Sequence, residues 1–319
     1  MKKYIILFIW AFSLFGCSQD ETDNNREDKI ITVSVKLNGE ISSGESLITR
    51  TETDSQDLIG IIVYKWSGSN WQGFAYGLFD NLDNVTINLL AGSKYKFKCT
   101  LIKDAKNKLF KNTDIYSRTC YPFWGTSNST FNNLNSPFSY TTGVYDYLQK
   151  DEVTIANNSH RCCIDIDRFY GELENYSPTV DGIVNINLKR VSFGLQVKVT
   201  GISDGTVDVT VKHKDAAVTF VSQTGLSSNY ESAATMYSMY HITNAWQYAD
   251  ADYQEPINVS VKWTRSVGVT EDLGTKTVNV KRNSLNIIHI KLTANGDGAA
   301  VGVREESASM GNESESFGN

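Results

Sequence analysis

Three groups of residues have types and spacings that could support chemistry. The run Gly201-Ile202-Ser203-Asp204-Gly205 fits the G-x-S-x-G pattern of a hydrolase nucleophile, which requires a strand, a sharp turn and then a helix. The residues that follow, Thr206 to Val211, alternate between polar and apolar types, which indicates a strand instead. A hairpin turn is therefore the favoured interpretation, and Ser203 is given no catalytic role.

The second group consists of acidic and thiol side chains around a predicted strand. Asp165 and Asp167 share one strand face, where two carboxylates could form an acid pair or bind calcium. His160 and Cys162 also share a face, whereas Cys163 faces the other way. Two ligands are too few for a zinc site. We expect solvated carboxylates and buried thiols, with no metal, no cofactor and no enzymatic activity.

The third group consists of aromatic side chains in a polar stretch near the middle of the second half of the chain. Trp246, Tyr248 and Tyr253 could stack on sugar rings. The favoured interpretation is that they cap the end of a hydrophobic core, because aromatic side chains dominate core burial. Glycan binding by these residues stays open as the alternative function.

The amino terminus has the pattern of an export signal. Lys2 and Lys3 precede an uncharged run, Tyr4 to Gly16, that is too short to span a membrane, and a small residue comes directly before Cys17. The order Leu14-Phe15-Gly16-Cys17 resembles the lipobox of bacterial lipoproteins, which implies that the Cys17 thiol carries acyl chains. A soluble secreted protein is the alternative. Residues 1–16 are thus the predicted lipoprotein signal peptide, and the polar, acidic residues 17–29 a flexible tether.

Composition limits the classes of partner and the redox state. The chain has 319 residues and a formal net charge of −6, which becomes −8 when Lys2 and Lys3 leave with the signal, so no basic surface for nucleic acid is expected. Export permits a disulfide. Cys99 and Cys120 could pair, but their spacing does not decide it.

Short alternating segments without a helical period predict an all-β fold. They fall into two successive sets, which indicates two β-sandwich domains in tandem. A composition break around Pro178 divides residues 30–177 from residues 178–295. Residues 296–319, which are rich in Gly, Ser and Glu, are predicted to be a disordered tail.

Several segments, taken in order, resemble the fimbrillin-like proteins of Bacteroidota, which include pilins and anchor subunits of type V pili. These are LITRTETD before DLIGIIVYKW, VTINLLAGSKYKFKC, NLKRVSFGLQVKVTGI and KRNSLNIIHIKLT. The resemblance implies two transthyretin-like domains and a lipid-anchored protein of the outer membrane surface or a fimbria that functions in adhesion. It also implies that the partners are other pilus subunits, in a homo- or hetero-oligomer, together with ligands on host or bacterial surfaces.

Family pilins are cut after an arginine, and the resemblance places this candidate cleavage site between Arg50 and Thr51. A solvated arginine in a surface loop is the alternative interpretation of Arg50. The apolar strand with Ile31, Val33, Val35 and Leu37 lies upstream of Arg50, so the cut would release it. Its loss would leave a groove with unpaired backbone groups, which a strand from another subunit could fill. The sequence therefore predicts a non-enzymatic structural subunit or anchor of a pilus.

Overall fold

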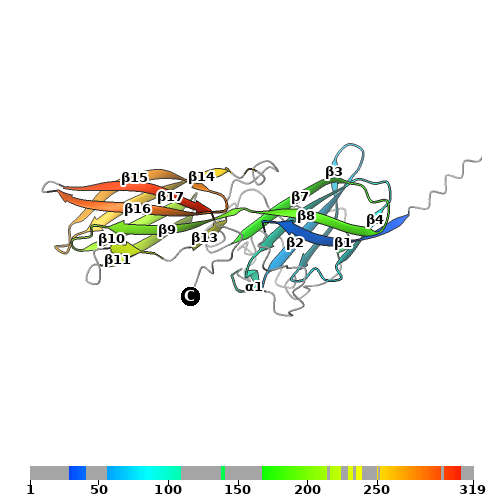
Figure 1. Cartoon of the computed structure of the whole chain (residues 1–319), viewed down its shortest axis with the longest axis horizontal. Coiled ribbons are helices and arrows are strands. Elements are labelled where there is room, and N and C mark those ends of the chain that lie inside the picture. Colours follow the sequence, from blue (N-terminus) through cyan, green and yellow to red (C-terminus); the bar gives the residue numbers. More distant parts are fainter. Residues whose placement is uncertain are drawn as a thin grey trace, which may run out of the picture.

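The computed structural model describes residues 29–40, 56–108, 138–140, 167–213, 216–223, 229–232, 235–238, 250, 252–295 and 298–309. Within these ranges the chain is almost entirely β-strand, and its one helix is the short α1, Ala105–Lys108. The predicted all-β fold is confirmed. Figure 1 shows the strands in two groups that follow each other along the long axis of the molecule.

The first group is an eight-stranded sheet in the order β4-β1-β8-β7-β5-β2-β3-β6. Its strands are β1 (Ile30–Gly39), β2 (Leu58–Trp66), β3 (Trp71–Phe79), β4 (Thr86–Leu90), β5 (Tyr95–Ile102), β6 (Ser139–Tyr140), β7 (Arg168–Tyr176) and β8 (Gly182–Arg190). Strand β1 pairs antiparallel with β4 and parallel with β8, so it is an interior strand. Strands β7 and β8 share two register pairs, Phe169 with Arg190 and Tyr170 with Lys189.

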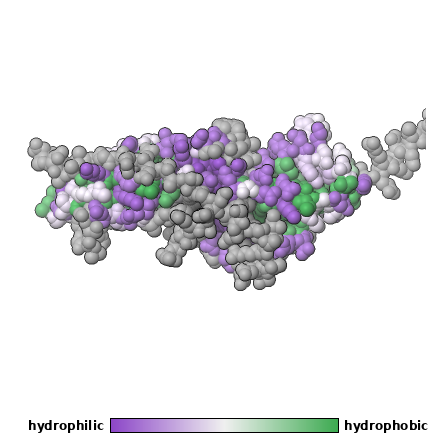
Figure 2. Space-filling view, in the orientation of Figure 1, coloured by the Kyte–Doolittle hydropathy of each residue, from purple (hydrophilic) through white to green (hydrophobic). Residues whose placement is uncertain are grey.

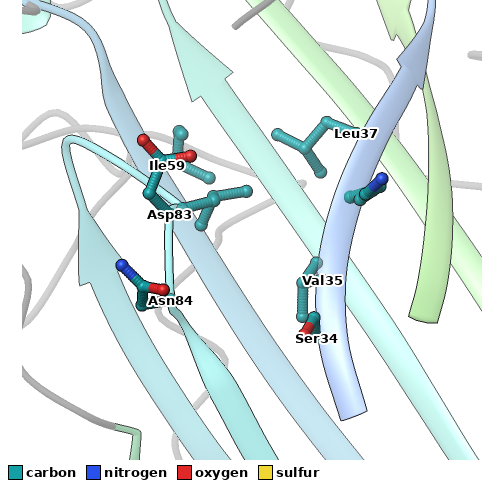
Figure 3. Close-up of a pocket in the computed structure, with 8 residues that line it drawn as sticks. Ser34, Val35, Leu37, Ile59, Asp83 and Asn84 are labelled. Carbon is teal, nitrogen blue, oxygen red and sulfur yellow. The ribbon is translucent and has the colours of Figure 1, made fainter. Parts of the chain in front are cut away.

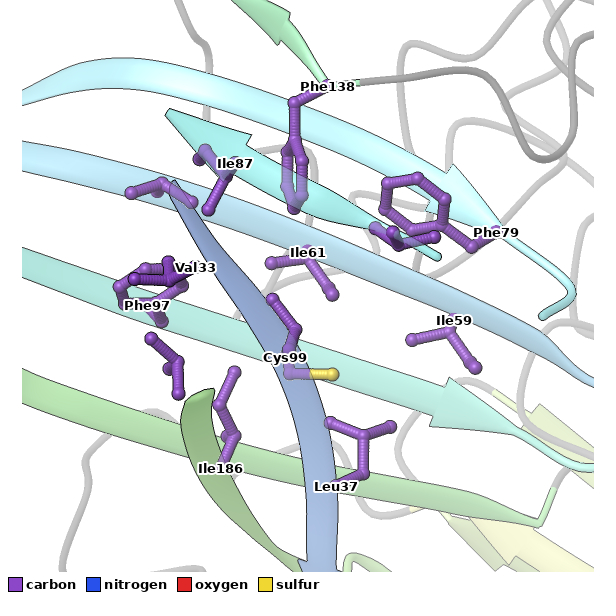
Figure 4. Close-up of a cluster of buried hydrophobic side chains, with 14 of the residues drawn as sticks. Val33, Leu37, Ile59, Ile61, Phe79, Ile87, Phe97, Cys99, Phe138 and Ile186 are labelled. Atoms are coloured by element: carbon purple, nitrogen blue, oxygen red, sulfur yellow. The ribbon is translucent and has the colours of Figure 1, made fainter. Parts of the chain in front are cut away.

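The two halves of this sheet enclose one hydrophobic core. Ile31, Val33, Val35 and Leu37 of β1 are at most 4% exposed, as the two-residue period of a half-buried strand requires. They pack in one cluster with buried side chains of β2, β3, β4, β5 and β8 (Figure 4). The narrow β7–β8 connection therefore lets the β4-β1-β8 part of the sheet face the β5-β2-β3 part, in the manner of a sandwich.

The second group consists of two sheets that also face each other. Its strands are β9 (Ser192–Thr200), β10 (Thr206–His213), β11 (Ala216–Gln223), β12 (Asn229–Glu231), β13 (Thr235–Ser238), β14 (Gln254–Thr264), β15 (Thr270–Lys281), β16 (Ser284–Asn295) and β17 (Gly298–Ser309). One sheet has the order β11-β10-β14-β15, and the other has the order β12-β9-β16-β17 with β13 also paired to β9. Apolar side chains of β9 and β16 pack against those of β10, β14 and β15.

Two expectations about chain organisation are corrected by the strand pairing. The predicted boundary at 177/178 places β8 in the second domain, but β8 pairs with β1 in the first sheet. A composition break marks a loop, and here the loop joins two strands of the same sheet. The tail predicted as disordered contains β17, which pairs with β16 along its whole length. Backbone pairing does not require apolar side chains, so composition gave no signal for it.

Candidate functional site

Strand β1 is the candidate functional element, because all four predicted strand-exchange residues lie on it and face the first core. Antiparallel β4 pairs with Ile30 to Ser34, whereas parallel β8 pairs with Val33 to Gly39. The second half of β1 is therefore bordered by β8 but not by β4. Only Val33 and Ser34 are paired on both sides, because Ile30 to Thr32 pair with β4 alone and the residues after Ser34 pair with β8 alone.

A pocket of about 180 Å³ lies beside this second half of β1. Its lining comes from β1, from Ile59 on β2 and from the loop between β3 and β4, as Figure 3 shows: Ser34, Val35, Lys36, Leu37, Ile59, Leu82, Asp83 and Asn84. The pocket is large enough for an apolar side chain of moderate size. It thus provides space next to the part of β1 that pairs with β8 alone.

The end of β1 is tied to the second group of strands by a buried ion pair. Glu40 follows Gly39 directly, and its backbone N–H donates to the Leu188 oxygen at 2.9 Å. Arg282, in the turn between β15 and β16, donates from Nη1 to Glu40 Oε2 at 2.7 Å and from Nη2 to Oε1 at 3.2 Å. The Arg282 side chain is 2% exposed and that of Glu40 is 20% exposed. One carboxylate therefore bridges two parts of the chain 242 residues apart.

Further hydrogen bonds fix this carboxylate and this guanidinium in place. The Arg190 backbone N–H donates to Glu40 Oε2 at 2.9 Å, and the Arg190 carbonyl accepts from Arg282 Nη1 at 2.8 Å. Arg282 Nε donates to the Asp250 carbonyl at 3.1 Å. The groups that hold the Glu40 carboxylate, namely the Arg282 guanidinium with the Arg190 N–H and the Arg190 and Asp250 carbonyls, are called the Arg282 socket below.

Electrostatics at the Arg282 socket favour an ionised acid. Burial by itself favours the neutral form of Glu40, but the Arg282 hydrogen bonds, the Arg190 N–H and the charges of Arg282 and Lys189 together lower its pKa. Glu40 therefore remains a carboxylate throughout the neutral range. The arrangement holds a carboxylate, which in the intact chain is that of Glu40, the residue after β1.

The region around Ser203 lacks the geometry of a hydrolase nucleophile. It connects β9 to β10, so a strand and not a helix follows the serine. Gly205 has φ 70°, and a Cβ at this position would collide with the Thr264 carbonyl, which explains the glycine of the motif without catalysis. Asp204 accepts from Arg265 Nη1 at 3.0 Å, and this hydrogen bond is the main reason that its pKa is lowered.

Tyr253 packs against the second core, so its ring is not fully exposed for stacking on a sugar. Its ring is partly buried against that cluster, and its hydroxyl donates to Glu255 Oε1 at 3.2 Å. Burial and the neighbouring Glu255 carboxylate raise the pKa of this phenol. Trp246 and Tyr248 lie outside the described residues, so the three predicted glycan-stacking residues are not brought together by the described part of the chain.

The other predicted acid and thiol residues are found in structural roles where they are described. Asp167 accepts from Arg190 Nε at 3.1 Å. Cys99 is a buried free thiol whose pKa is raised by burial, so it has no thiolate character at neutral pH. Among the described residues no group of three or more His, Cys, Asp or Glu could hold a metal ion. The remaining candidate residues of this group, together with Cys120, lie outside the described ranges: His160, Cys120, Cys162, Cys163 and Asp165.

The predicted lipidation and cleavage residues, Cys17, Arg50 and Thr51, also lie outside the described residues. Of the helices that the structure describes, none has the length and apolar character needed to cross a bilayer. On the face drawn in Figure 2, hydrophilic residues cover much of the described surface, and apolar residues form small separate areas.

Comparison with known proteins gives similar solved structures but no family assignment. No protein-family model matches the chain, and no curated protein matches it. The fimbrial anchor protein Mfa2 from Porphyromonas gingivalis is 8% identical with a TM-score of 0.40, and the match covers 87% of this chain and 97% of Mfa2. The tip fimbrial protein Mfa3 of the same organism, with a C-terminal truncation, is 12% identical with a TM-score of 0.35, covering 87% and 99%.

A candidate cell adhesion protein from Bacteroides eggerthii is 11% identical with a TM-score of 0.41, covering 88% of this chain and 96% of that one. These structures are fimbrial and adhesion proteins of Bacteroidota, the group that the sequence resemblance names. Their identities and TM-scores are too low to carry an argument about function.

Glu40 and Arg282 belong to the candidate site but were not predicted from the sequence. A charged residue three positions after Leu37, the last apolar residue of β1, is the one local signal for Glu40. For Arg282, in the turn Lys281-Arg282-Asn283, no pattern distinguishes a buried arginine from an exposed one. Glu40 and Arg282 come into contact because the first group of strands lies next to the second group. The spacing of residues along the sequence does not predict that arrangement.

Proposed function

We propose that this chain is a non-enzymatic, lipid-anchored protein of the outer membrane surface that serves as a structural subunit or anchor of a pilus in adhesion. In this proposal the two groups of strands are transthyretin-like domains, and assembly occurs by strand exchange after cleavage between Arg50 and Thr51. The observation that carries the proposal is the position of β1. It is an interior strand of the first core, yet it lies wholly upstream of Arg50.

The energetics of losing β1 support strand exchange. Four fully buried aliphatic side chains contribute about 1.5–3 kcal/mol each, or about 6–12 kcal/mol in total. Typical domains are stable by about 5–15 kcal/mol, so a cut chain without β1 is close to unfolding unless its groove is refilled. A strand from a second subunit would restore both the buried apolar contacts and the backbone pairing with β4 and β8. Cleavage would thereby couple removal of the tether to assembly.

The uncut chain has a different role in the same proposal. It keeps β1, and with it the link to residues 17–29 and to the acyl chains on Cys17. Two or three acyl chains contribute about 0.8 kcal/mol per buried methylene, which makes release from a membrane very slow. The uncut form is then an anchor, and the cut form is a subunit of the shaft or tip.

Replacing Cys17 with alanine should abolish incorporation of radioactive palmitate into the chain in cells, because Cys17 is the predicted acylation site. The measurement is autoradiography of the immunoprecipitated protein. The matched control is Cys99→Ala, which should leave labelling unchanged because Cys99 is buried in the folded chain. Labelling that persists in Cys17→Ala would contradict lipid anchorage through this residue.

Limited trypsin treatment of the folded, delipidated chain should cut after Arg50 and yield SDS-resistant oligomers. The oligomers form because the vacated β1 groove accepts the C-terminal segment of another copy, so deletion of residues 299–319 should weaken them. The measurement is gel electrophoresis without boiling, together with light scattering. Arg50→Ala is the control and should stay uncut at this site and monomeric. If the cut chain stays monomeric at high concentration, assembly by strand exchange is contradicted, and the role of the uncut chain as an anchor is the part of the proposal that is retained.

A further inference from the structure

We infer that the Arg282 socket selects the incoming strand by its carboxylate, and that the acid pair Glu305–Glu306 of a second copy replaces Glu40 there. This inference rests on the proposed function, because it requires that β1 leaves. It adds a specificity-determining site: the groove would accept an apolar strand only when a carboxylate follows that strand at the correct distance.

The first observation is that departure of β1 leaves a buried cation uncompensated. Glu40 lies upstream of Arg50 and would leave with β1. Arg282, whose side chain is 2% exposed in the intact chain, would then lose its carboxylate partner, although its bonds to the Arg190 and Asp250 carbonyls would remain. An uncompensated buried charge is strongly destabilising. The empty groove therefore favours an occupant that brings a negative charge to this end.

The second observation is the sequence of the C-terminal segment. The segment at the end of β1, Val35-Lys36-Leu37-Asn38-Gly39-Glu40, corresponds in pattern to Val301-Gly302-Val303-Arg304-Glu305-Glu306 in β17. Both segments have two branched apolar residues two positions apart, and a glutamate three positions after the second of them. Ala299 extends the apolar alternation of β17 by one more step, to the place of Val33. The segment can thus match both the core-facing positions of β1 and its terminal acid.

The third observation is that β17 can be released more easily than any interior strand. It lies at the end of the order β12-β9-β16-β17 and pairs with β16, which keeps β9 on its other side. Its detachment breaks one ladder of backbone hydrogen bonds, whereas removal of β16 would break two. Edge strands are the ordinary donors and acceptors in pairing between chains.

One difference between the two segments sets the design of the test. Gly39 has φ 113°, and a Cβ there would collide with the Leu188 carbonyl. Glu305 stands at the matching position, so the incoming strand has to leave β8 one residue earlier than β1 does. Either glutamate of the pair can then reach Arg282, and both are replaced together.

The test uses the chain cut after Arg50 and fluorescein-labelled synthetic peptides of residues 298–309, present in excess over the released β1 fragment. Fluorescence anisotropy gives the Kd of each peptide. The wild-type peptide should bind, and the E305Q/E306Q peptide should bind at least tenfold more weakly. A third peptide, E305S/E306S/S307E/S309E, keeps the composition and net charge but moves the acids, and it should bind as weakly as E305Q/E306Q. Because the changes are in the peptide, folding of the protein is the same in all three measurements.

The outcomes separate this inference from the proposed function. Equal affinities of the three peptides, or no binding of any peptide, would overturn the role of the socket. Oligomers of the cut chain that are equally stable with E305Q/E306Q would also overturn it, while leaving strand exchange in place. A cut chain that stays monomeric yet binds the wild-type peptide through its acids would support the socket and contradict polymerisation. In an Arg282→Gln chain that folds, the wild-type and E305Q/E306Q peptides should bind equally.

Discussion

Replacing Trp263 with alanine should lower the free energy of unfolding by roughly 3–5 kcal/mol, the range for a fully buried large aromatic side chain. Trp263 is 0% exposed and lies in the second core on β14. Its indole Nε1 donates to the Asp204 carbonyl at 2.7 Å, and the Arg265 guanidinium carbon lies 3.5 Å from the ring centroid. The variant thus loses core volume, a hydrogen bond and a cation–π contact together.

Urea unfolding followed by circular dichroism measures this effect. Trp263→Phe is the matched control, because it keeps most of the buried ring and loses the hydrogen bond to Asp204; a loss of roughly 1–2 kcal/mol is expected from the unpaired carbonyl and the smaller ring. Trp66, which is 37% exposed, provides a second comparison. A Trp263→Ala chain as stable as Trp66→Ala would show that the second core does not depend on this side chain.

Replacing Glu40 with glutamine should lower the free energy of unfolding at neutral pH by roughly 3–5 kcal/mol, because Arg282 would remain charged and buried without its counter-charge. The pKa of Glu40 is lower in the folded chain than in the unfolded chain. Its contribution is therefore fully present above the unfolded pKa and is lost as pH falls through the folded pKa. The difference between wild type and Glu40→Gln should shrink on acidification through that window.

The same unfolding measurements at a series of pH values test this prediction. Glu174→Gln is the matched control, since Glu174 pairs with Lys96 at 3.2 Å but its side chain is 49% exposed. An exposed pair of this kind contributes about 0–1 kcal/mol, so the control should change stability little. If the gap between wild type and Glu40→Gln were constant or grew as pH fell, the ionised carboxylate of Glu40 would not be what stabilises the junction.

Alternation of residue types predicted many strands at their correct places. Ile31 to Leu37, Tyr95 to Leu101 and Phe193 to Val199 show the two-residue period, and each lies in a strand with that face buried. The interpretation of Ser203 as a turn residue agrees with the strand β10 that follows it. These features are local, because the period depends on neighbouring residues that face one common core.

The candidate site could be predicted from sequence only in part. The four apolar residues of β1 were identified by their period, but the importance of Glu40 was not, because its partner Arg282 is 242 residues away. The pairing of β8 with β1 was missed for a similar reason: parallel neighbours need a long crossover, and nothing local marks the partner. Strand β17 was missed because its position depends on the unpaired edge of β16.

Local periodicity and turn chemistry are enough to predict the all-β class, the inward residues of β1 and the turn character of the Ser203 region. Tertiary structure alone decided that β1 is an interior strand, that the first core extends to β8, and that a buried guanidinium from the turn after β15 holds the end of β1. The physical reason is the separation along the sequence of the residues that interact. The burial pattern of a strand is visible in residues two positions apart in the sequence. Strand order and ion pairing depend instead on which distant segments come together around one core, and on which buried charges then need a partner.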